Sequence, residues 1–317
     1  INRFREILDE EIAGMEDGMM QSGNRTATSR VLSYFSAYNA YIQKISGIDY
    51  YRFLKDIRES LKTDAPAVLE QLKETADIIL RTDNLRIRLT LDEENLSPVS
   101  NKLEVFLKEL PAGSSPLASP EVVRFVPEKK NEGFITPAKV QYVAEGGETA
   151  IPYSGHAAVL LQITRLNYLW NQVRVMGGAY GCSATIDRHG RITMSSYRDP
   201  NLAETLQVYE KSGEVLSAFE ADEQEMLKYI IGTLAGLDPV MTVSMKGTLA
   251  NDALETGLTG EHLLKSSREV LSTTPEDVRK AAAAFTEAMG HHCICVVGSE
   301  TKIRENAHLL DHVETLF

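Results

Sequence analysis

Cysteine is scarce in this sequence, and its few copies follow no scaffold-like pattern. The three cysteines, Cys182, Cys293 and Cys295, are odd in number and lack the spacing of a disulfide framework. Disulfide-rich secreted folds are therefore excluded. Cysteine usage of this kind favours a reducing compartment, so we expect a cytoplasmic protein.

Long apolar runs and a surplus of basic residues are also missing. The longest apolar stretches, such as Ala157–Ile163 with Gln162 inside it, are far shorter than the roughly 20 residues that span a bilayer. Lys and Arg number 33 against 45 Asp and Glu, which gives a formal net charge of −12. Nucleic-acid binding requires a basic face, which this balance disfavours. We therefore expect neither a membrane nor a nucleic acid as a partner.

Common motifs of nucleophilic and nucleotide-dependent enzymes are absent. The sequence contains no G-x-S-x-G, no G-K-[ST] and no G-x-G-x-x-G. Its glycine-rich segment, GGAYG at 177–181, follows a predicted helix and precedes a predicted strand. Phosphate loops have the reverse order, with the strand before the loop and the helix after it. A dehydrogenase or another nucleotide enzyme is thus disfavoured.

Two segments contain residue types that bind metals. The segment H-L-L-D-H at 308–312 resembles an inverted zinc motif with Asp in place of Glu. Asp is one methylene too short for the general base, so we interpret this segment as the polar face of a C-terminal helix. The segment H-H-C-I-C at 291–295 is extended, whereas tetrahedral zinc sites usually gather ligands from two separate segments. We predict no metal site in this chain.

Length and periodicity predict two domains. At about 150 residues per domain, 317 residues correspond to two. The first part is mostly helical, because apolar residues recur at helical spacing over five segments; these are 4–20, 26–38, 51–61, 65–80 and 101–110. Residues 85–90 (LRIRLT) alternate between apolar and polar and predict a strand. The segment 112–120 is rich in Pro, Ser and Ala and predicts a linker.

The second part mixes strands and helices. We predict strands over 121–126, 139–144, 183–187, 191–196 and 292–297, and helices over 155–172, 197–219, 222–237, 261–271, 275–289 and 302–312. The first of these helices has an apolar stripe that includes Leu166 and Trp170. Because strands and helices do not strictly alternate, the pattern favours an α+β fold with an antiparallel sheet.

Arg174 and Tyr180 flank the glycine-rich turn. An arginine can hold a carbonyl or carboxylate, and a tyrosine hydroxyl can donate to a developing oxyanion. On local features alone, however, we favour an exposed arginine and a core tyrosine at a helix end.

A longer pattern changes this interpretation. The block N-Y-L-W-N-Q-V-R-V-M-G-G-A-Y-G at 167–181, followed by S-Y-R-D-P-N at 196–201, resembles the C-terminal half of the presequence proteases. These enzymes form a branch of the pitrilysin/insulinase zinc metallopeptidases. L-S-Y-F-S-A-Y at 32–38 and S-G-I-D-Y-Y-R-F-L at 46–54 resemble the preceding domain of that family. The resemblance therefore extends over nearly the whole chain.

The resemblance implies an architecture. In that family, four similar α+β domains form two bowl-shaped halves that close around a peptide, and the H-x-x-E-H zinc site lies in the first domain. Residues 1–111 would be the C-terminal portion of the third domain, incomplete and mostly helical. Residues 112–120 would be a linker, and residues 121–317 a complete fourth domain with an antiparallel sheet packed against helices.

The resemblance also implies roles for this chain's residues. Arg174 would bind a backbone carbonyl of the substrate, and Tyr180 would donate to the tetrahedral oxyanion formed when zinc-bound water attacks the peptide bond. Gly177, Gly178 and Ala179 would leave room for the peptide to lie against the backbone. The expected function is that of the substrate-clamping region of a zinc-dependent oligopeptidase.

The chain departs from the family pattern at the metal. It has no true H-x-x-E-H and no downstream glutamate ligand, so we expect it to be inactive alone, to bind no zinc and to depend on the N-terminal half of the same polypeptide. The absence of a starting methionine agrees with this expectation. The alternative is a non-catalytic peptide-binding or scaffold subunit of the same superfamily.

Overall fold

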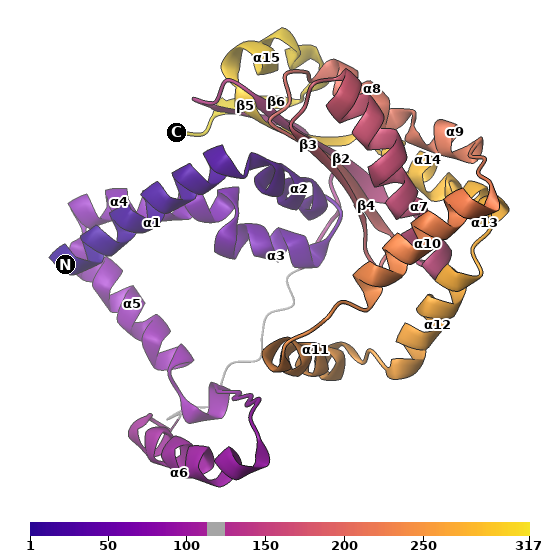
Figure 1. The fold of residues 1–317 in the computed structure, drawn as a ribbon. Helices are drawn as coiled ribbons and strands as arrows, with labels where there is room; N and C mark the ends of the chain where they lie inside the picture. The colour runs from indigo at the N-terminus through magenta and orange to yellow at the C-terminus, as the bar shows by residue number, and fades with distance from the viewer. Residues whose placement is uncertain (113–123) are drawn as a thin grey trace. The chain divides into compact units, whose positions relative to one another are not determined.

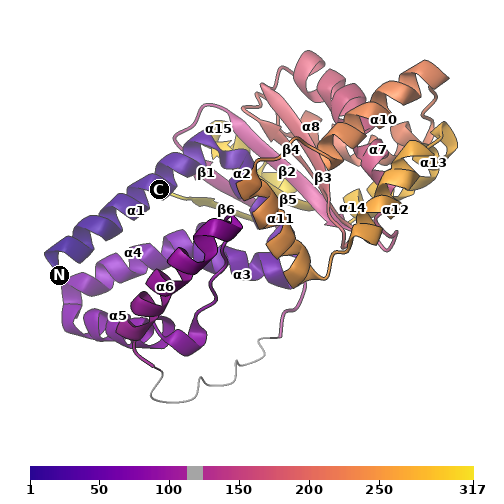
Figure 2. The ribbon, with the colours of Figure 1, turned by 60° about the horizontal axis from the view of Figure 1, so that its bottom comes forward.

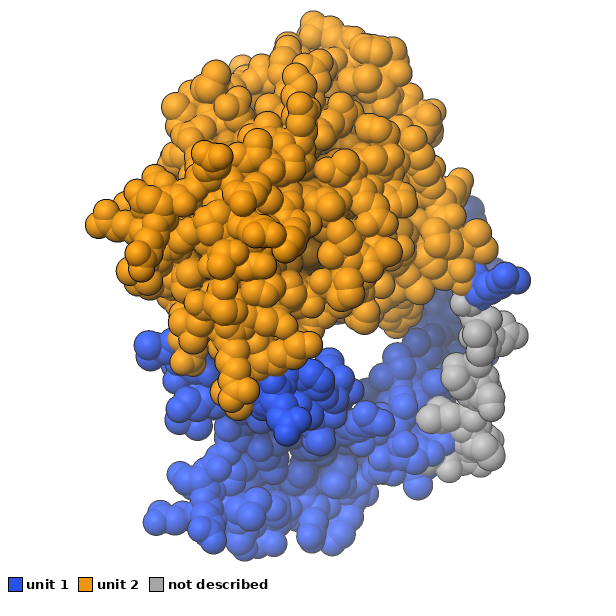
Figure 3. Space-filling view, turned by 90° about the vertical axis from the view of Figure 1, so that its right-hand side faces the viewer, with its two compact units in different colours: residues 1–6, 56–124, 239–263 blue, residues 7–55, 125–238, 264–317 orange. Residues whose placement is uncertain are grey.

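The computed structural model describes residues 1–112 and 124–317. They form two compact units, each assembled from separate stretches of the chain (Figure 3). The larger unit comprises residues 7–55, 125–238 and 264–317, and the smaller unit comprises residues 1–6, 56–124 and 239–263. The predicted linker, apart from residue 112, and the first half of the predicted strand at 121–126 lie outside the described residues.

A six-stranded mixed sheet is the centre of the larger unit. Its strands in spatial order are β3 (Gly181–Ile186), β4 (Arg191–Tyr197), β2 (Gln141–Glu148), β5 (Cys293–Ser299), β1 (Asn131–Thr136) and β6 (His312–Thr315). β1 is parallel to both of its neighbours, and the other three pairs are antiparallel. The α+β prediction is confirmed, with the correction that the sheet is not purely antiparallel.

Helices from the second part of the chain cover one face of the sheet (Figures 1 and 2). Sheet residues such as Val143 and Met194 form an apolar core with helical residues such as Leu160 and Phe285. The helices that contribute to this core are α7 (Gly155–Ile163), the π-helix η2 (Thr164–Met176), α8 (Ala203–Glu210), α9 (Ser212–Ser217), α10 (Glu223–Leu237), α13 (Pro275–Ala281) and α14 (Ala283–Met289). Two more helices, α12 (Gly260–Leu271) and α15 (Glu300–Glu305), add Val270 and Ile303 to the same core.

The opposite face of the sheet is covered by α2 (Gly23–Ser33), close to the start of the chain (Figure 1). Gly23 lies directly against the ring of Tyr142, where a Cβ would clash at 2.2 Å, and the Tyr142 hydroxyl donates to the Met20 carbonyl at 2.6 Å. The neighbouring N-terminal helices are α1 (Asn2–Gln21), α3 (Ala37–Ser46) and α4 (Ile48–Thr63). Residues 7–55 therefore complete the sandwich around the sheet.

The smaller unit contains α5 (Ala65–Ile79), a short 3₁₀ turn η1 (Thr82–Asn84), α6 (Glu93–Glu109) and α11 (Val243–Thr256). The Asp64 side chain caps α5 by accepting from the Ala67 N–H. Residues 85–90 form no strand, which contradicts the prediction. Arg88 instead forms an ion pair with Glu255 of α11, and Leu85, Ile87 and Leu89 remain exposed. An alternating pattern cannot make a strand without a neighbouring strand to bond.

Three further predictions about elements are wrong. Residues 124–126 form no strand, and the predicted helix over 302–312 ends at Glu305 and gives way to a 3₁₀ turn η3 (Ala307–Leu309) and to β6. The predicted helix over 155–172 changes to π geometry at Thr164. The wider π turn rotates later residues away from the α-helical face, so Leu166 and Trp170 are exposed. β1, most of α3 and α11 were not predicted.

Among the described residues, no helix is both long enough and apolar enough to cross a membrane.

Candidate functional site

Arg174 lies on the π-helix η2, next to an aromatic platform. Leu169 and Val173 bury one side of this helix, and the Arg165 side chain donates to the Ala184 carbonyl at 2.6 Å, which ties η2 to β3. On the exposed side, the Arg174 guanidinium carbon lies 3.9 Å from the centre of the Trp170 ring. Stacking of this kind orients an arginine without consuming its donors.

The chain leaves η2 through the glycine-rich turn. The amides of Gly177, Gly178 and Ala179 donate back to the carbonyls of η2 at 3.0–3.1 Å. Gly178 has φ +82°, a left-handed value that favours glycine, and a Cβ on Gly177 would lie 2.6 Å from the Val173 carbonyl oxygen. Ala179 is buried. Both glycines are therefore required by the turn itself.

The segment S-Y-R-D-P-N at 196–201 holds this turn in place. The Asn201 side chain donates to the Gly177 carbonyl at 2.6 Å. Asp199 is buried and accepts from the Thr205 hydroxyl at 2.7 Å and the Asn201 N–H at 2.9 Å. Burial raises the pKa of Asp199, and these two hydrogen bonds oppose that rise. The two blocks that stand apart in the sequence thus form one hydrogen-bonded unit.

Tyr180 projects from the end of this unit. Its N–H donates to the Tyr197 carbonyl at 3.0 Å, at the start of the β3–β4 hairpin. Its side chain is 69% exposed, and its ring meets the edge of the Tyr197 ring at 5.9 Å between centres. The prediction of a core tyrosine from local features is wrong, because the Tyr180 side chain is mostly exposed and contacts the sheet only through the Tyr197 ring.

The guanidinium of Arg174 and the hydroxyl of Tyr180 have no polar partner within the described part of the chain. The Arg174 guanidinium has no ion pair or hydrogen bond there, and the same holds for the Tyr180 hydroxyl. One permanent cation and one phenol are thus held on either side of a short, fixed turn, with their donors free. Such a pair can bind a carbonyl oxygen and donate to an oxyanion.

Cys182 follows the turn as a half-buried thiol. Burial raises the pKa of its thiol to about 11, although the Arg174 charge acts against that rise. The thiol is therefore neutral at physiological pH, and neutral thiols are poor nucleophiles.

The two predicted metal-like segments do not assemble as metal sites on their own. His308 lies in the 3₁₀ turn η3 and His312 begins β6, so they do not share a helix face. Cys293 and Cys295 are free and buried in β5, whereas His292 is exposed and pairs with Glu145 and Glu210. No local sequence signal could find that pairing, since the three residues are far apart in the sequence.

Comparison with known proteins decides the family. The model of the PreP C-terminal domain matches residues 131–300, which is more than half of the chain, and a second family model for a segment associated with the same peptidases matches residues 1–57. The chain belongs to the presequence protease family. The family consists of zinc metallopeptidases of the pitrilysin type.

Curated relatives extend well beyond this chain. Protein HypA of Clostridium perfringens is 36% identical over 100% of this chain and 32% of its own length. Presequence protease 1 of Arabidopsis thaliana, chloroplastic/mitochondrial, is 28% identical over 89% of this chain and 26% of its own length. The chain thus spans about a third of the length of these relatives or less.

A solved structure shares the fold. The crystal structure of pitrilysin matches with a TM-score of 0.59 and 13% identity, over 93% of this chain and 31% of that one. The pitrilysin-like α+β architecture expected from the sequence resemblance is confirmed.

Proposed function

We propose that this chain is the C-terminal, substrate-clamping region of a zinc-dependent oligopeptidase that hydrolyses short unstructured peptides in a closed chamber. The observation that carries the proposal is the paired presentation of Arg174 and Tyr180, whose donors are free and whose backbones are fixed by one hydrogen-bonded turn.

Arg174 binds a backbone carbonyl of the peptide in this proposal. A guanidinium offers five N–H donors in a planar fork, and stacking on Trp170 leaves the edge of that fork free. An arginine placed this way fixes the register of an extended peptide without selecting a side chain.

Tyr180 donates its phenolic proton to the tetrahedral oxyanion. The side chain is mostly exposed, while the backbone N–H bonds to the Tyr197 carbonyl at the end of β4 and the ring packs on the Tyr197 ring. A preorganised neutral donor stabilises charge that develops in the transition state and needs little reorganisation. Gly177, Gly178 and Ala179 present no bulky side chain beside it, so the peptide can approach the backbone.

The metal chemistry belongs to another part of the proposed enzyme. Zinc activates the attacking water and polarises the scissile carbonyl when it is bound. Its ligands lie outside this chain, in the N-terminal half of the same polypeptide. The chain alone is therefore inactive, and its partners are that half and the peptide substrate.

Two single substitutions test the proposal in the full-length protein that contains this chain. Arg174→Ala and Tyr180→Phe should each reduce hydrolysis of a quenched-fluorescence peptide, while zinc content stays at the wild-type level. Arg268→Ala serves as the control, because Arg268 is an exposed arginine on α12, outside the turn and the segment at 196–201. Wild-type turnover in both variants would refute the assigned roles. A wild-type protein that binds peptides but never cleaves them would favour a non-catalytic scaffold.

A further inference from the structure

A buried carboxylate without a hydrogen-bond partner lies on the sheet face that packs against α7, α8 and α14. Glu145 is in β2, opposite Ile294 of the apolar core, and its side chain is 0% exposed. Neither of its carboxylate oxygens has a hydrogen-bond partner in residues 1–112 and 124–317. Burial of an ionised carboxylate is strongly unfavourable unless a cation or several donors compensate it.

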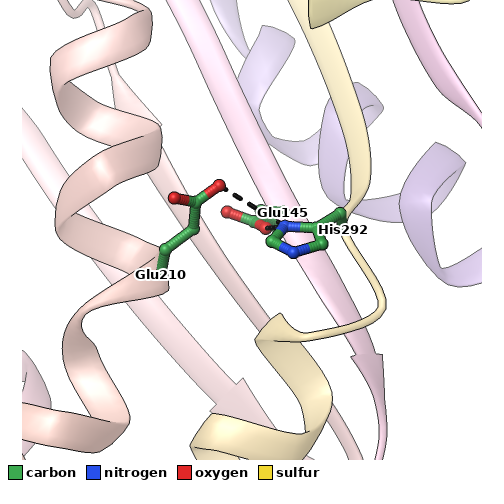
Figure 4. A group of neighbouring side chains, drawn as sticks. All are labelled: Glu145, Glu210 and His292. Atoms are coloured by element: carbon green, nitrogen blue, oxygen red, sulfur yellow. Dashed lines mark ion pairs between the residues drawn. The ribbon is translucent and has the colours of Figure 1, made fainter.

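Two further ligand-type side chains point toward Glu145 from other elements (Figure 4). Glu210 is the last residue of α8, and His292 lies in the turn between α14 and β5. His292 Nδ1 is 3.5 Å from Glu145 Oε1 and 3.4 Å from Glu210 Oε1. One ligand atom from each of the three residues lies within 4.8 Å of the other two.

The turn that carries His292 is tightly fixed. The His291 and His292 amides donate to the carbonyls of Ala288 and Met289 at 3.2 and 3.0 Å. His292 has φ +49°, a left-handed conformation that is uncommon for a residue other than glycine. This turn holds the imidazole against the two carboxylates.

The cluster brings two carboxyl groups to one imidazole. Glu145 is fully buried beside Glu210 and His292, and no described side chain donates a hydrogen bond to its oxygens. Two carboxylates and one imidazole are a donor set that borderline divalent cations bind. A cation would neutralise both carboxylates and give the orphaned oxygens of Glu145 a partner.

Two of the three spacings, 3.4 and 3.5 Å from His292 Nδ1 to the two carboxylates, are close to those of tetrahedral zinc. Bonds of about 2.0–2.1 Å at tetrahedral angles place neighbouring ligand atoms about 3.3 Å apart. We propose that Glu145, Glu210 and His292 form a binding site for a divalent cation of the zinc class, with a fourth position open to solvent. The opening follows from the exposure of Glu210 and His292, which are 42% and 46% exposed.

The site would connect three elements that are distant in sequence: β2, the end of α8 and the turn before β5. Its effect is therefore structural, a clip between the sheet and the helices that cover it. It goes beyond the proposed peptidase function, because the catalytic zinc of that proposal is bound by residues outside this chain. The prediction of no metal site considered His292 only with its neighbours in sequence.

Zinc titration of the 317-residue chain tests the site. The chain is first treated with a chelator, then titrated with ZnCl₂ by calorimetry, and its bound zinc is counted after desalting. Glu145→Gln and His292→Gln should each bind one zinc fewer than the wild type. His291→Gln is the matched control, since His291 is the exposed neighbour outside the cluster, and it should behave as the wild type.

Thermal unfolding gives a second measurement. At a zinc concentration about 100 times the dissociation constant, the melting temperature of the wild type should rise by about 5 °C or more. The rise should persist in His291→Gln and disappear in Glu145→Gln and His292→Gln, with folding of each variant checked by circular dichroism. Equal zinc stoichiometry and equal shifts in all four proteins would overturn the proposal. So would failure of the wild type to bind zinc.

Discussion

The guanidinium carbon of Arg174 lies 3.9 Å from the centre of the Trp170 ring, on the exposed side of the π-helix η2. The Trp170 ring thus orients the arginine without using any of its hydrogen-bond donors. Trp170 itself is partly exposed. We infer that this tryptophan is a positioning residue for Arg174 and not a member of the core.

Substitution of Trp170 should therefore weaken the function assigned to Arg174. An exposed cation–π contact contributes about 0.5–1 kcal/mol, so Trp170→Leu should lower kcat/KM for peptides about two- to fivefold in the whole protein. Most of the change should be in KM, because Arg174 binds the ground-state peptide. Val175→Ala changes an exposed neighbour on the same helix and should have no effect. A Trp170→Leu enzyme with wild-type KM would contradict this role.

Arg30 and Glu132 connect the N-terminal helices to the sheet through a buried ion pair. Arg30 Nε donates to Glu132 Oε2 at 2.6 Å, and Tyr34 donates to the same carboxylate at 2.7 Å. Arg30→Ala would leave Glu132 buried without its cation, so we expect the free energy of unfolding to fall by about 3–5 kcal/mol. Chemical denaturation measures the change. Arg25→Ala, on the exposed side of α2, should change it by no more than about 0.5 kcal/mol; equal effects would rule out the ion pair as the cause.

Acid should destabilise the larger unit through the same carboxylate. Burial favours protonation of Glu132, but the hydrogen bonds from Arg30 and Tyr34 outweigh it and keep the pKa of Glu132 below its ordinary value of 4.5. A lowered native pKa adds stability above pH 4.5, which is lost as pH falls through the native value. Unfolding free energy should therefore drop below about pH 4.5. The drop should be smaller in Glu132→Gln; an identical pH profile in that variant would contradict the linkage.

Gly178 and Gly236 should respond oppositely to alanine. Gly178 has φ +82°, so Gly178→Ala should destabilise the turn by about 1 kcal/mol, although its nearest neighbour leaves room for a Cβ. Gly236 lies in α10 with open space around it, and Gly236→Ala should stabilise the chain by about 0.5–1 kcal/mol. Melting curves of the two variants provide the comparison. Similar shifts in both would mean that the left-handed backbone does not constrain position 178.

The sequence predicted most helices because their signals are local. The predicted helices over 222–237 and 65–80 correspond to α10 and α5. The structure shows the Asp222–Glu225 capping box at the start of α10 and Pro66 in the first turn of α5. The β3–β4 hairpin was also predicted, since its strands are joined by a short polar turn. The strand at 85–90 failed because its pattern carries no information about whether a partner strand exists.

The glycine-rich turn with Arg174 and Tyr180 could be predicted from the sequence, whereas the proposed cation site could not. Arg174, Tyr180 and the segment at 196–201 lie in two continuous blocks, so a family resemblance could identify them. The hydrogen bond from Asn201 to Gly177 became visible only in three dimensions. Glu145, Glu210 and His292 are ordinary residues in their own segments, and only the packing of β2, α8 and β5 brings them together.

The rate of the chemical step in the Tyr180→Phe variant tests the central claim most directly. Loss of one oxyanion donor typically lowers kcat by about 10²–10³. In the whole protein, Tyr180→Phe should therefore lower single-turnover peptide cleavage by about that factor, with peptide affinity and zinc content unchanged. Tyr38→Phe, which alters another exposed tyrosine, should leave the rate at the wild-type value. Cleavage by Tyr180→Phe at a rate within twofold of wild type would contradict the account.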